Sequence, residues 1–290
     1  DSTGGSFTFD SHNANQYADM DGGLAVASVS GLSLYDENGK ELSVVQAKLE
    51  TPAIRAGSDL ALAFDVGGND LLAVKKTGET ALSVTTQQPI FDADLAQDGS
   101  ICYAAQETGY KTVLYVFDSK QNRIYRWLSA SAYMPLCAVS PGAKELAAVS
   151  FGQKDGIFAA SLHIFDTSSD EAGLTAALGN DLIYDLTFLD ANTICAIGET
   201  GAQWLDLSGS RLASYTYDGA YLKDFDFGGE GFVSLIVNMY KAGSHCTVVT
   251  VDKTGAELGK EAFDTQILDF SAAGSYLAVL TAEKLQIFDS

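Results

Sequence analysis

One short pattern recurs seven times along the 290 residues and constrains the fold more than any other feature of the sequence. In each copy an apolar run, which usually ends on aspartate, is followed in most cases by a glycine-containing turn and a second apolar run. The seven copies are residues 32–36, 71–75, 114–118, 162–166, 203–206, 248–252 and 285–289. Two apolar runs joined by such a turn are typical of a β-hairpin. The sequence therefore predicts a repeat protein made of seven similar β-units.

The spacing of the copies predicts the size of each unit. Their last residues are separated by 39, 43, 48, 40, 46 and 37 residues, which fits four short strands with their turns. Two more strand-like runs precede each copy, and the fifth unit shows all four strands most clearly. They are residues 182–188, 193–197, 202–207 and 212–217. We therefore expect an all-β, seven-bladed β-propeller with four antiparallel strands per blade, in which residues 1–290 form a single domain.

The two ends of the chain complete one another in this prediction. The last unit stops after its third strand, and the chain begins with an apolar run at residues 6–10 that belongs to no unit. We expect this run to supply the fourth strand of the last blade and so to close the ring, because an unpaired edge would expose backbone donors and acceptors. Consecutive apolar residues, as in 60–64 and 232–237, indicate sheets that are covered on both faces.

The net charge argues against a nucleic-acid partner, and the hydropathy argues against a transmembrane segment. Acidic residues outnumber basic ones by 38 to 17, which gives a net charge of −21. Such a chain repels phosphate backbones, so we expect no nucleic-acid partner. No apolar run is long enough for a transmembrane helix, so we expect no transmembrane segment in this chain. It opens at Asp1 without an initiator Met, and we expect that it was cut from a longer protein.

The sequence carries none of the common motifs for catalysis, metal binding or cofactor binding. The sequence contains no nucleophile elbow, zinc-binding helix, P-loop or dinucleotide-binding motif, and its three histidines fall in different units. We therefore predict no catalytic residue, no metal site and no cofactor. The four cysteines are far apart in apolar surroundings, and we favour four buried free thiols over a disulfide. They are Cys102, Cys137, Cys195 and Cys246.

The first predicted strand of every unit carries a polar side chain or a cysteine at an equivalent position, most often a carboxylate. These residues are Asp19, Arg55, Asp92, Cys137, Asp185, Asp224 and Asp269, with second acids at Asp21, Asp94 and Asp226. The first strand is innermost in a propeller, so we expect these side chains near one mouth of the central channel. Three interpretations stay open: acceptors of backbone N–H bonds, which we favour, a cation site, and contacts to a partner or ligand.

Aromatic residues are expected at the same end of the propeller, in the loops before the first strands and the hairpins between the second and third strands. They are Tyr17, Phe91, Tyr110, Tyr133, Tyr184, Tyr221 and Tyr240. Tyrosine is common at interfaces because it combines contact area with a polar tip. Packing between blades is the alternative and is favoured for each residue taken singly. The longest of these hairpins are predicted at residues 106–111, 152–157 and 239–244.

Through the repeated Ile-Phe-Asp or Tyr-Asp ending, the chain resembles WD40-like and related bacterial seven-bladed propellers, whose repeats carry Trp-Asp there. Neither the Gly-His nor the Trp-Asp pair of WD40 repeats is present. The chain also resembles divergent, uncharacterised propellers that Gram-positive gut bacteria carry outside a single membrane anchor. This resemblance implies an extracytoplasmic protein, anchored to a bacterial membrane through a segment absent from this chain.

These observations predict a monomeric, non-enzymatic binding or scaffold module that engages an unknown protein, peptide or glycan at one face of the propeller. The predicted contact residues are the aromatic residues named above together with Asp19, Arg55, Asp92, Asp185, Asp224 and Asp269. The rival hypothesis is an extracytoplasmic hydrolase or lyase in which two channel-mouth aspartates act as acid and base. A structural spacer without a ligand is the third possibility.

Overall fold

The computed structural model describes residues 13–289, and all regular secondary structure within them is β. The described residues form 27 strands, arranged in seven antiparallel sheets that we call blades one to seven in chain order. The structure divides into two compact units, which are described separately below. The first contains residues up to Gly152 and Ser161–Thr175, and the second contains Gln153–Ala160 and the residues from Ala176 onward.

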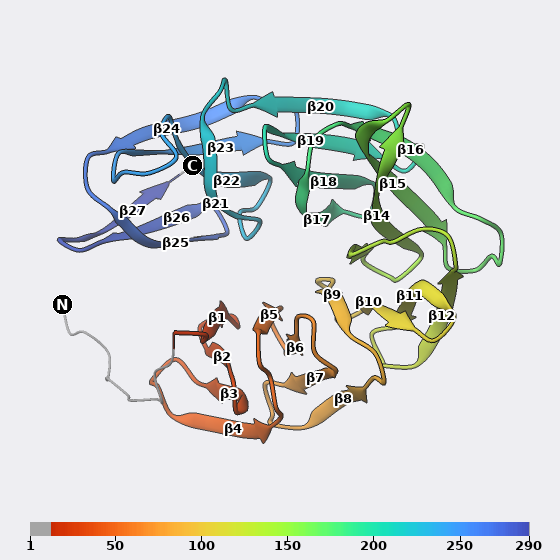
Figure 1. Cartoon of the computed structure of the whole chain (residues 1–290). Helices are drawn as coiled ribbons and strands as arrows, with labels where there is room; N and C mark the ends of the chain where they lie inside the picture. The colour runs from red at the N-terminus through yellow and green to blue at the C-terminus, as the bar shows by residue number, and fades with distance from the viewer. Residues whose placement is uncertain (1–12, 290) are drawn as a thin grey trace. The chain divides into compact units, whose positions relative to one another are not determined.

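The first unit holds blades one, two and three, and in each of them consecutive strands lie side by side (Figure 1). Blade one consists of β1 (Gln16–Asp19), β2 (Leu24–Ser28), β3 (Gly31–Tyr35) and β4 (Glu41–Gln46). Blade two consists of β5 (Pro52–Ala56), β6 (Leu60–Asp65), β7 (Asp70–Lys75) and β8 (Thr80–Thr85). Blade three consists of β9 (Ile90–Leu95), β10 (Ile101–Glu107), β11 (Tyr110–Phe117) and β12 (Arg123–Ser129).

Blade four has residues in both units, and blades five to seven belong to the second unit. Blade four consists of β13 (Leu136–Val139), β14 (Glu145–Lys154), β15 (Ile157–Asp166) and β16 (Leu174–Gly179). Blade five consists of β17 (Ile183–Asp190), β18 (Thr193–Gly198), β19 (Gly201–Asp206) and β20 (Arg211–Thr216). Blade six consists of β21 (Tyr221–Asp226), β22 (Phe232–Asn238), β23 (Cys246–Asp252) and β24 (Glu257–Phe263). Blade seven consists of β25 (Ile267–Ala273), β26 (Tyr276–Thr281) and β27 (Leu285–Asp289).

The strands confirm the repeat that was predicted from the sequence. Each of the seven copies forms the third strand of its blade, from β3 to β27, and the four strands expected in the fifth unit match β17–β20 to within two residues at each end. Blade seven has three strands in the described residues. The run at residues 6–10, which was expected to complete it, lies outside them.

Two of the three hairpins predicted to be long have tight turns instead. Strands β10 and β11 are joined only by Thr108 and Gly109, and β14 and β15 only by Asp155 and Gly156. Gly109 has a φ of 88°, while Asp155 and Gly156 have φ values of 54° and 78°. Positive φ values are what two-residue hairpin turns require. The polar residues on either side extend the strands, so the prediction of long loops is wrong at both places and correct only between β22 and β23.

Side chains on alternate faces of one strand pack into different apolar clusters. On β6, Ala61 and Ala63 belong to a cluster shared by blades one and two, whereas Leu62 and Phe64 belong to a cluster shared by blades two and three. Blades five and six, and blades six and seven, share further clusters of the same kind. The predicted burial of both sheet faces is thus confirmed, and the core consists of layers between neighbouring blades.

The aspartate that ends the repeated pattern has a structural role in the turn after the third strand. Asp206 Oδ1 accepts hydrogen bonds from the N–H groups of Ser208 and Ser210, at 2.8 and 2.9 Å. Asp252 Oδ1 accepts from Thr254 and Ala256 in the same way, at 2.8 and 3.0 Å. Hydrogen bonds from the Ser208 and Thr254 hydroxyl groups, together with these N–H groups, lower the pKa of Asp206 and of Asp252. Some of the acidic residues of the chain therefore stabilise these turns.

Candidate functional site

Two aspartates on β9 join blade three to blade four inside the first unit. Oδ2 of Asp92 accepts the N–H of Cys137 at 3.0 Å, and Oδ2 of Asp94 accepts the N–H of Val139 at 3.1 Å. Oδ1 of Asp92 also accepts the N–H of Ala93 at 2.9 Å. Both carboxylates are buried, with 6% and 7% exposure. They project from the same face because they are two residues apart on a strand. The favoured interpretation of Asp92, as an acceptor for a neighbouring blade, is confirmed.

The other polar residues predicted for the first unit also bond to the backbone. Oδ2 of Asp19 accepts the N–H of Asp21 at 3.1 Å, and Nη1 of Arg55 donates to the carbonyl of Ile54 at 3.3 Å. Strands β1 and β5, which carry Asp19 and Arg55, pack against one another. These residues therefore form part of the local structure of blades one and two.

In the second unit, a carboxylate of an inner strand also accepts a backbone hydrogen bond from the next blade, at the junction between blades six and seven. Oδ2 of Asp226 accepts the N–H of Ala272 at 3.2 Å. Asp224 and Asp269 instead bond to their own strands, each accepting the N–H of the following residue at 2.9 Å. Asp185, on β17, does the same with the N–H of Leu186 at 2.8 Å. Asp224 and Asp269 are both exposed, unlike Asp92.

A pocket of about 300 Å³ opens at this junction, and Asp224 and Asp269 both line it. The remaining lining comes from β21, from β22 and β23 with the loop between them, and from the start of β25 with the residue before it. These residues are Lys223, Ile236, Lys241, Ala242, Gly243, Ser244, Cys246, Gln266, Ile267 and Leu268. We call this hollow the Asp224–Asp269 pocket. It joins carboxylates, ammonium groups and the exposed apolar side chain of Leu268 in one concave surface.

The electrostatics of the pocket are unfavourable for its own carboxylates. Burial by the surrounding protein raises the pKa of Asp224, and repulsion from Asp269 and Asp226 raises it further. The pKa of Asp226 is raised by burial as well. The two lysines that line the pocket make other contacts: Lys223 Nζ donates to the carbonyl of Lys241 at 2.6 Å, and Lys241 Nζ lies 5.9 Å from the ring centre of Tyr221.

The predicted tyrosines are exposed, and the packing interpretation favoured for them is wrong. In the first unit Tyr17, Tyr110 and Tyr133 are 46%, 36% and 45% exposed. In the second unit Tyr184, Tyr221 and Tyr240 are 42%, 41% and 69% exposed. Phe91 is half-buried and packs against the apolar cluster of blades three and four, so the packing interpretation is confirmed for this residue. Its ring meets that of Tyr133 edge to face, with ring centres 5.0 Å apart. The interior positions that packing requires are taken by other tyrosines, including Tyr103, Tyr125 and Tyr217.

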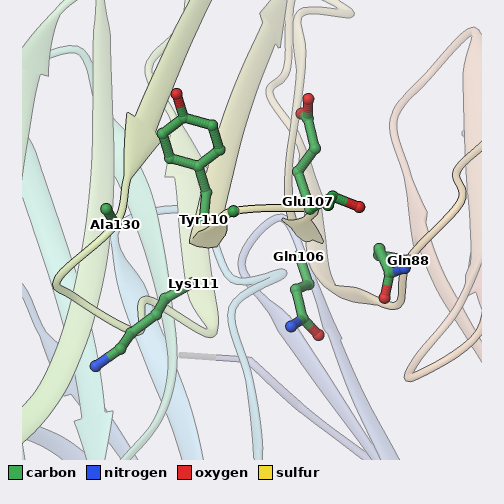
Figure 2. Close-up of a pocket in the computed structure, with 8 residues that line it drawn as sticks. Gln88, Gln106, Glu107, Tyr110, Lys111 and Ala130 are labelled. Carbon is green, nitrogen blue, oxygen red and sulfur yellow. The ribbon is translucent and has the colours of Figure 1, made fainter.

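A second hollow of about 440 Å³ lies on blade three around the β10–β11 hairpin (Figure 2). Figure 2 shows Glu107 and Tyr110 projecting to one side of this hairpin, and Gln106 and Lys111 to the other. Glu107 is already engaged, because Oε2 accepts the hydroxyl of Tyr115 at 3.1 Å and Oε1 accepts Nη2 of Arg126 at 2.8 Å. The side chains do not converge on one point, so this hollow is the weaker candidate.

Sequence reasoning found the acids and tyrosines of the second unit but missed most of the pocket. Lys223, Lys241, Leu268 and Cys246 carry no motif, and only the length of the loop between β22 and β23 pointed to this region. Cys246 is half-buried rather than buried, so the prediction for the cysteines is correct for three of the four. Within residues 13–289, no group of three or more His, Cys, Asp or Glu side chains could hold a metal ion.

Comparison with protein families places the chain among relatives whose function is also open. A family model described as "Family of unknown function (DUF5711)" matches residues 2–290. The chain belongs to this family. No curated protein gives a significant match. In the described residues, no helix is long and apolar enough to cross a membrane.

Solved structures establish the fold of this DUF5711 chain. One similar structure is described as "Structure of Dos1 propeller", with a TM-score of 0.62 and 12% identity over 94% of this chain and 77% of that chain. Another is Hsv2p of Kluyveromyces lactis, with a TM-score of 0.57 and 10% identity over 95% and 91% of the two chains. A third similar structure, of a eukaryotic initiation factor, has a TM-score of 0.55 and 11% identity over 99% of this chain and 88% of that chain. The predicted fold class, an all-β propeller with seven blades, is thus confirmed.

Proposed function

We propose that this DUF5711 chain is a non-enzymatic binding module that engages its partner at the Asp224–Asp269 pocket. The observation that carries the proposal is the pairing of two exposed carboxylates with exposed Leu268 around one concave surface. The exposed ring of Tyr221 lies next to this surface, with its centre 5.9 Å from Nζ of the lining residue Lys241. Aromatic and apolar groups supply the area that binding buries, and a few polar groups fix the orientation of the ligand.

The charge of the pocket favours a protein or peptide that brings a basic group. Asp224 and Asp269 repel one another, and a cation placed between them would relieve this repulsion. The net charge of −21 would also attract a basic partner from a distance. Binding should therefore weaken as salt is added, because salt screens exposed charges. A neutral glycan would bind with little dependence on salt, which distinguishes the two classes.

The test begins with a pull-down from membrane or cell-wall extract, using the intact chain as bait, and continues with affinities for the partner that is recovered. We expect Tyr221→Ala to weaken binding by roughly thirtyfold, as for a central aromatic anchor. Asp224→Asn and Asp269→Asn should also weaken it. Lys40→Ala and Lys253→Ala are matched controls, since these lysines lie in the turns after β3 and β23. The melting temperature of every variant must stay at that of the parent.

Cys246 offers a second readout that needs no substitution in the pocket. It lines the pocket and is half-buried, whereas Cys102, Cys137 and Cys195 are buried. A thiol reagent added to the folded chain should therefore label Cys246 first, and a bound partner should slow this reaction. If a saturating concentration of the partner left the rate of Cys246 labelling unchanged, the interface would lie elsewhere. Tyr133→Ala then tests the first unit, in which Tyr133 is an exposed aromatic residue in the loop before β13.

The rival enzymatic function has its own test. Turnover that is abolished by Asp185→Asn or Asp224→Asn would replace the binding proposal, because removal of a general acid or base lowers the rate of the chemical step.

We also propose that the protein is extracytoplasmic and anchored to a bacterial membrane, on the strength of the resemblance to anchored propellers. Protease treatment of intact cells should degrade the chain if this is correct and spare it otherwise.

A further inference from the structure

Two cysteine thiols touch one another across the junction between blades three and four. Cys102 lies on β10 and Cys137 on β13, and their Sγ atoms are 3.5 Å apart. Both side chains are buried, with 0% and 1% exposure, and both belong to the same apolar cluster in the first unit. A disulfide has an S–S bond of about 2.05 Å, so bond formation requires the sulfurs to approach by about 1.5 Å.

The backbone on both sides holds this pair in place. Cys102 lies opposite Asp94 in the antiparallel pairing of β9 and β10. The N–H of Cys137 is fixed by the carboxylate of Asp92, and its Sγ lies 3.8 Å from the Asp92 carbonyl oxygen. The contact therefore joins two sites anchored by regular hydrogen bonding. Cys195 provides a comparison: it is equally buried, but it packs in the cluster shared by blades five and six, which contains no second cysteine.

We propose that Cys102 and Cys137 are a site of disulfide formation, which cross-links blades three and four. This inference is independent of the proposed binding function. The oxidant is a low-molecular-weight disulfide such as oxidised glutathione, which accepts the two electrons that the protein loses.

The exchange proceeds in two balanced steps. One cysteine thiolate attacks a sulfur of the oxidant, which forms a mixed disulfide and releases one glutathione thiolate. The second cysteine thiolate then attacks the protein sulfur of the mixed disulfide, which forms the Cys102–Cys137 bond and releases a second glutathione thiolate. The two protons lost by the cysteines end on the two glutathione thiols.

Burial determines when this reaction can take place. It raises the pKa of both thiols, so few thiolates exist in the folded state, and the thiolate is the reactive form. We expect the bond to form during folding or local opening and to be slow to form in the closed native state. Once formed, it closes a loop between positions 35 apart in sequence and so restricts the unfolded chain.

The experiment starts from the fully reduced chain. One sample is kept folded with millimolar oxidised glutathione, and a second is refolded from urea in the same buffer. Both are quenched in acid, their free thiols are alkylated under denaturing conditions, and the peptides are mapped by mass spectrometry. We expect a linked peptide pair containing Cys102 and Cys137, formed faster on refolding, and a rise in melting temperature of about 5–10 °C that a reductant reverses.

Two variants serve as controls. Cys195→Ala removes an equally buried thiol and should leave the linked pair unchanged, whereas Cys102→Ala should abolish the link and the rise in melting temperature. A glutathione adduct on half-buried Cys246 is recognised by its mass and does not count as the link. The proposal is overturned if neither sample contains the linked pair, or if Cys102 or Cys137 is joined to a different cysteine.

Discussion

The junction between blades three and four is closed by two buried carboxylates, whereas the junction between blades six and seven leaves the carboxylates of Asp224 and Asp269 exposed. Asp92 uses both of its oxygens for backbone N–H groups, one of them in the next blade. At the equivalent position, Asp224 bonds to its own strand and lines a pocket. The same residue type at the same place in the repeat therefore stabilises one junction and stays accessible in the other.

The residue at the equivalent position of the next blade explains part of this difference. Blade four has Cys137 at the equivalent position, where the N–H donates to the Asp92 carboxylate and the thiol packs in the apolar layer. Blade seven has Asp269 there, and this second carboxylate repels Asp224. The neutral thiol of Cys137 adds no such repulsion beside Asp92.

The largest expected effect comes from truncating the buried carboxylate. Asp92→Ala leaves the buried N–H groups of Ala93 and Cys137 without their acceptor and should reduce the free energy of unfolding by about 3 kcal/mol. Asp224→Ala should change it by less than about 0.5 kcal/mol, since changes at exposed positions usually cost little. Urea denaturation of both variants measures the difference. Equal losses would show that the two junctions do not differ in the way we describe.

A smaller effect is expected from pH. The pKa of Asp224 in the folded state is raised above the ordinary value of 3.8, so just above this pH the folded chain holds more protons than the unfolded chain. The contribution of Asp224 to the free energy of unfolding therefore falls as the pH rises from the ordinary pKa through the raised pKa of the folded state. Asp224→Asn removes the effect, so the stability of the variant relative to the parent should increase as the pH is raised from about 4 to about 7.

The turn aspartates provide the control for this experiment. Hydrogen bonds lower the pKa of Asp206 in the folded state, so its contribution to stability is present at neutral pH and is lost as the pH falls. Asp206→Asn should therefore lose stability relative to the parent at neutral pH and regain it in acid, which is the opposite trend. If both variants followed the same trend, the carboxylates of the pocket and of the turns would not differ in electrostatics.

The repeat was predictable from sequence because its signals are local. An apolar run, an aspartate and a glycine define the third strand and the turn after it, and Asp252 bonds to N–H groups only two and four residues away. Strand positions followed from these signals. The length of the β10–β11 hairpin did not, because the polar residues near a hairpin tip occur equally in loops and in exposed strand ends.

The functional site depends on contacts that the sequence does not record. Aligning the units identified Asp92 and Asp224 as equivalent, yet their burial is decided by a residue 45 positions later in the chain. In the same way, Tyr221 and buried Tyr217 lie four residues apart and differ only in what packs against them. Such differences arise from the neighbouring blade, so the candidate residues could be named in advance but not divided into structural and accessible ones.

The smallest expected effect is that of calcium, which tests whether the open junction is a cation site. Calcium takes six to eight oxygen ligands. The pocket offers two carboxylates, and one oxygen of each already accepts a backbone N–H. A site saturated one hundredfold above its dissociation constant would stabilise the fold by about 2.7 kcal/mol. We expect millimolar calcium, and then a chelator, to move the melting temperature by less than about one degree, as for a site far from saturation. A clear upward shift that Asp224→Asn abolishes and Asp92→Asn preserves would assign the open junction to cation binding, because only the exposed carboxylates could then be the ligands.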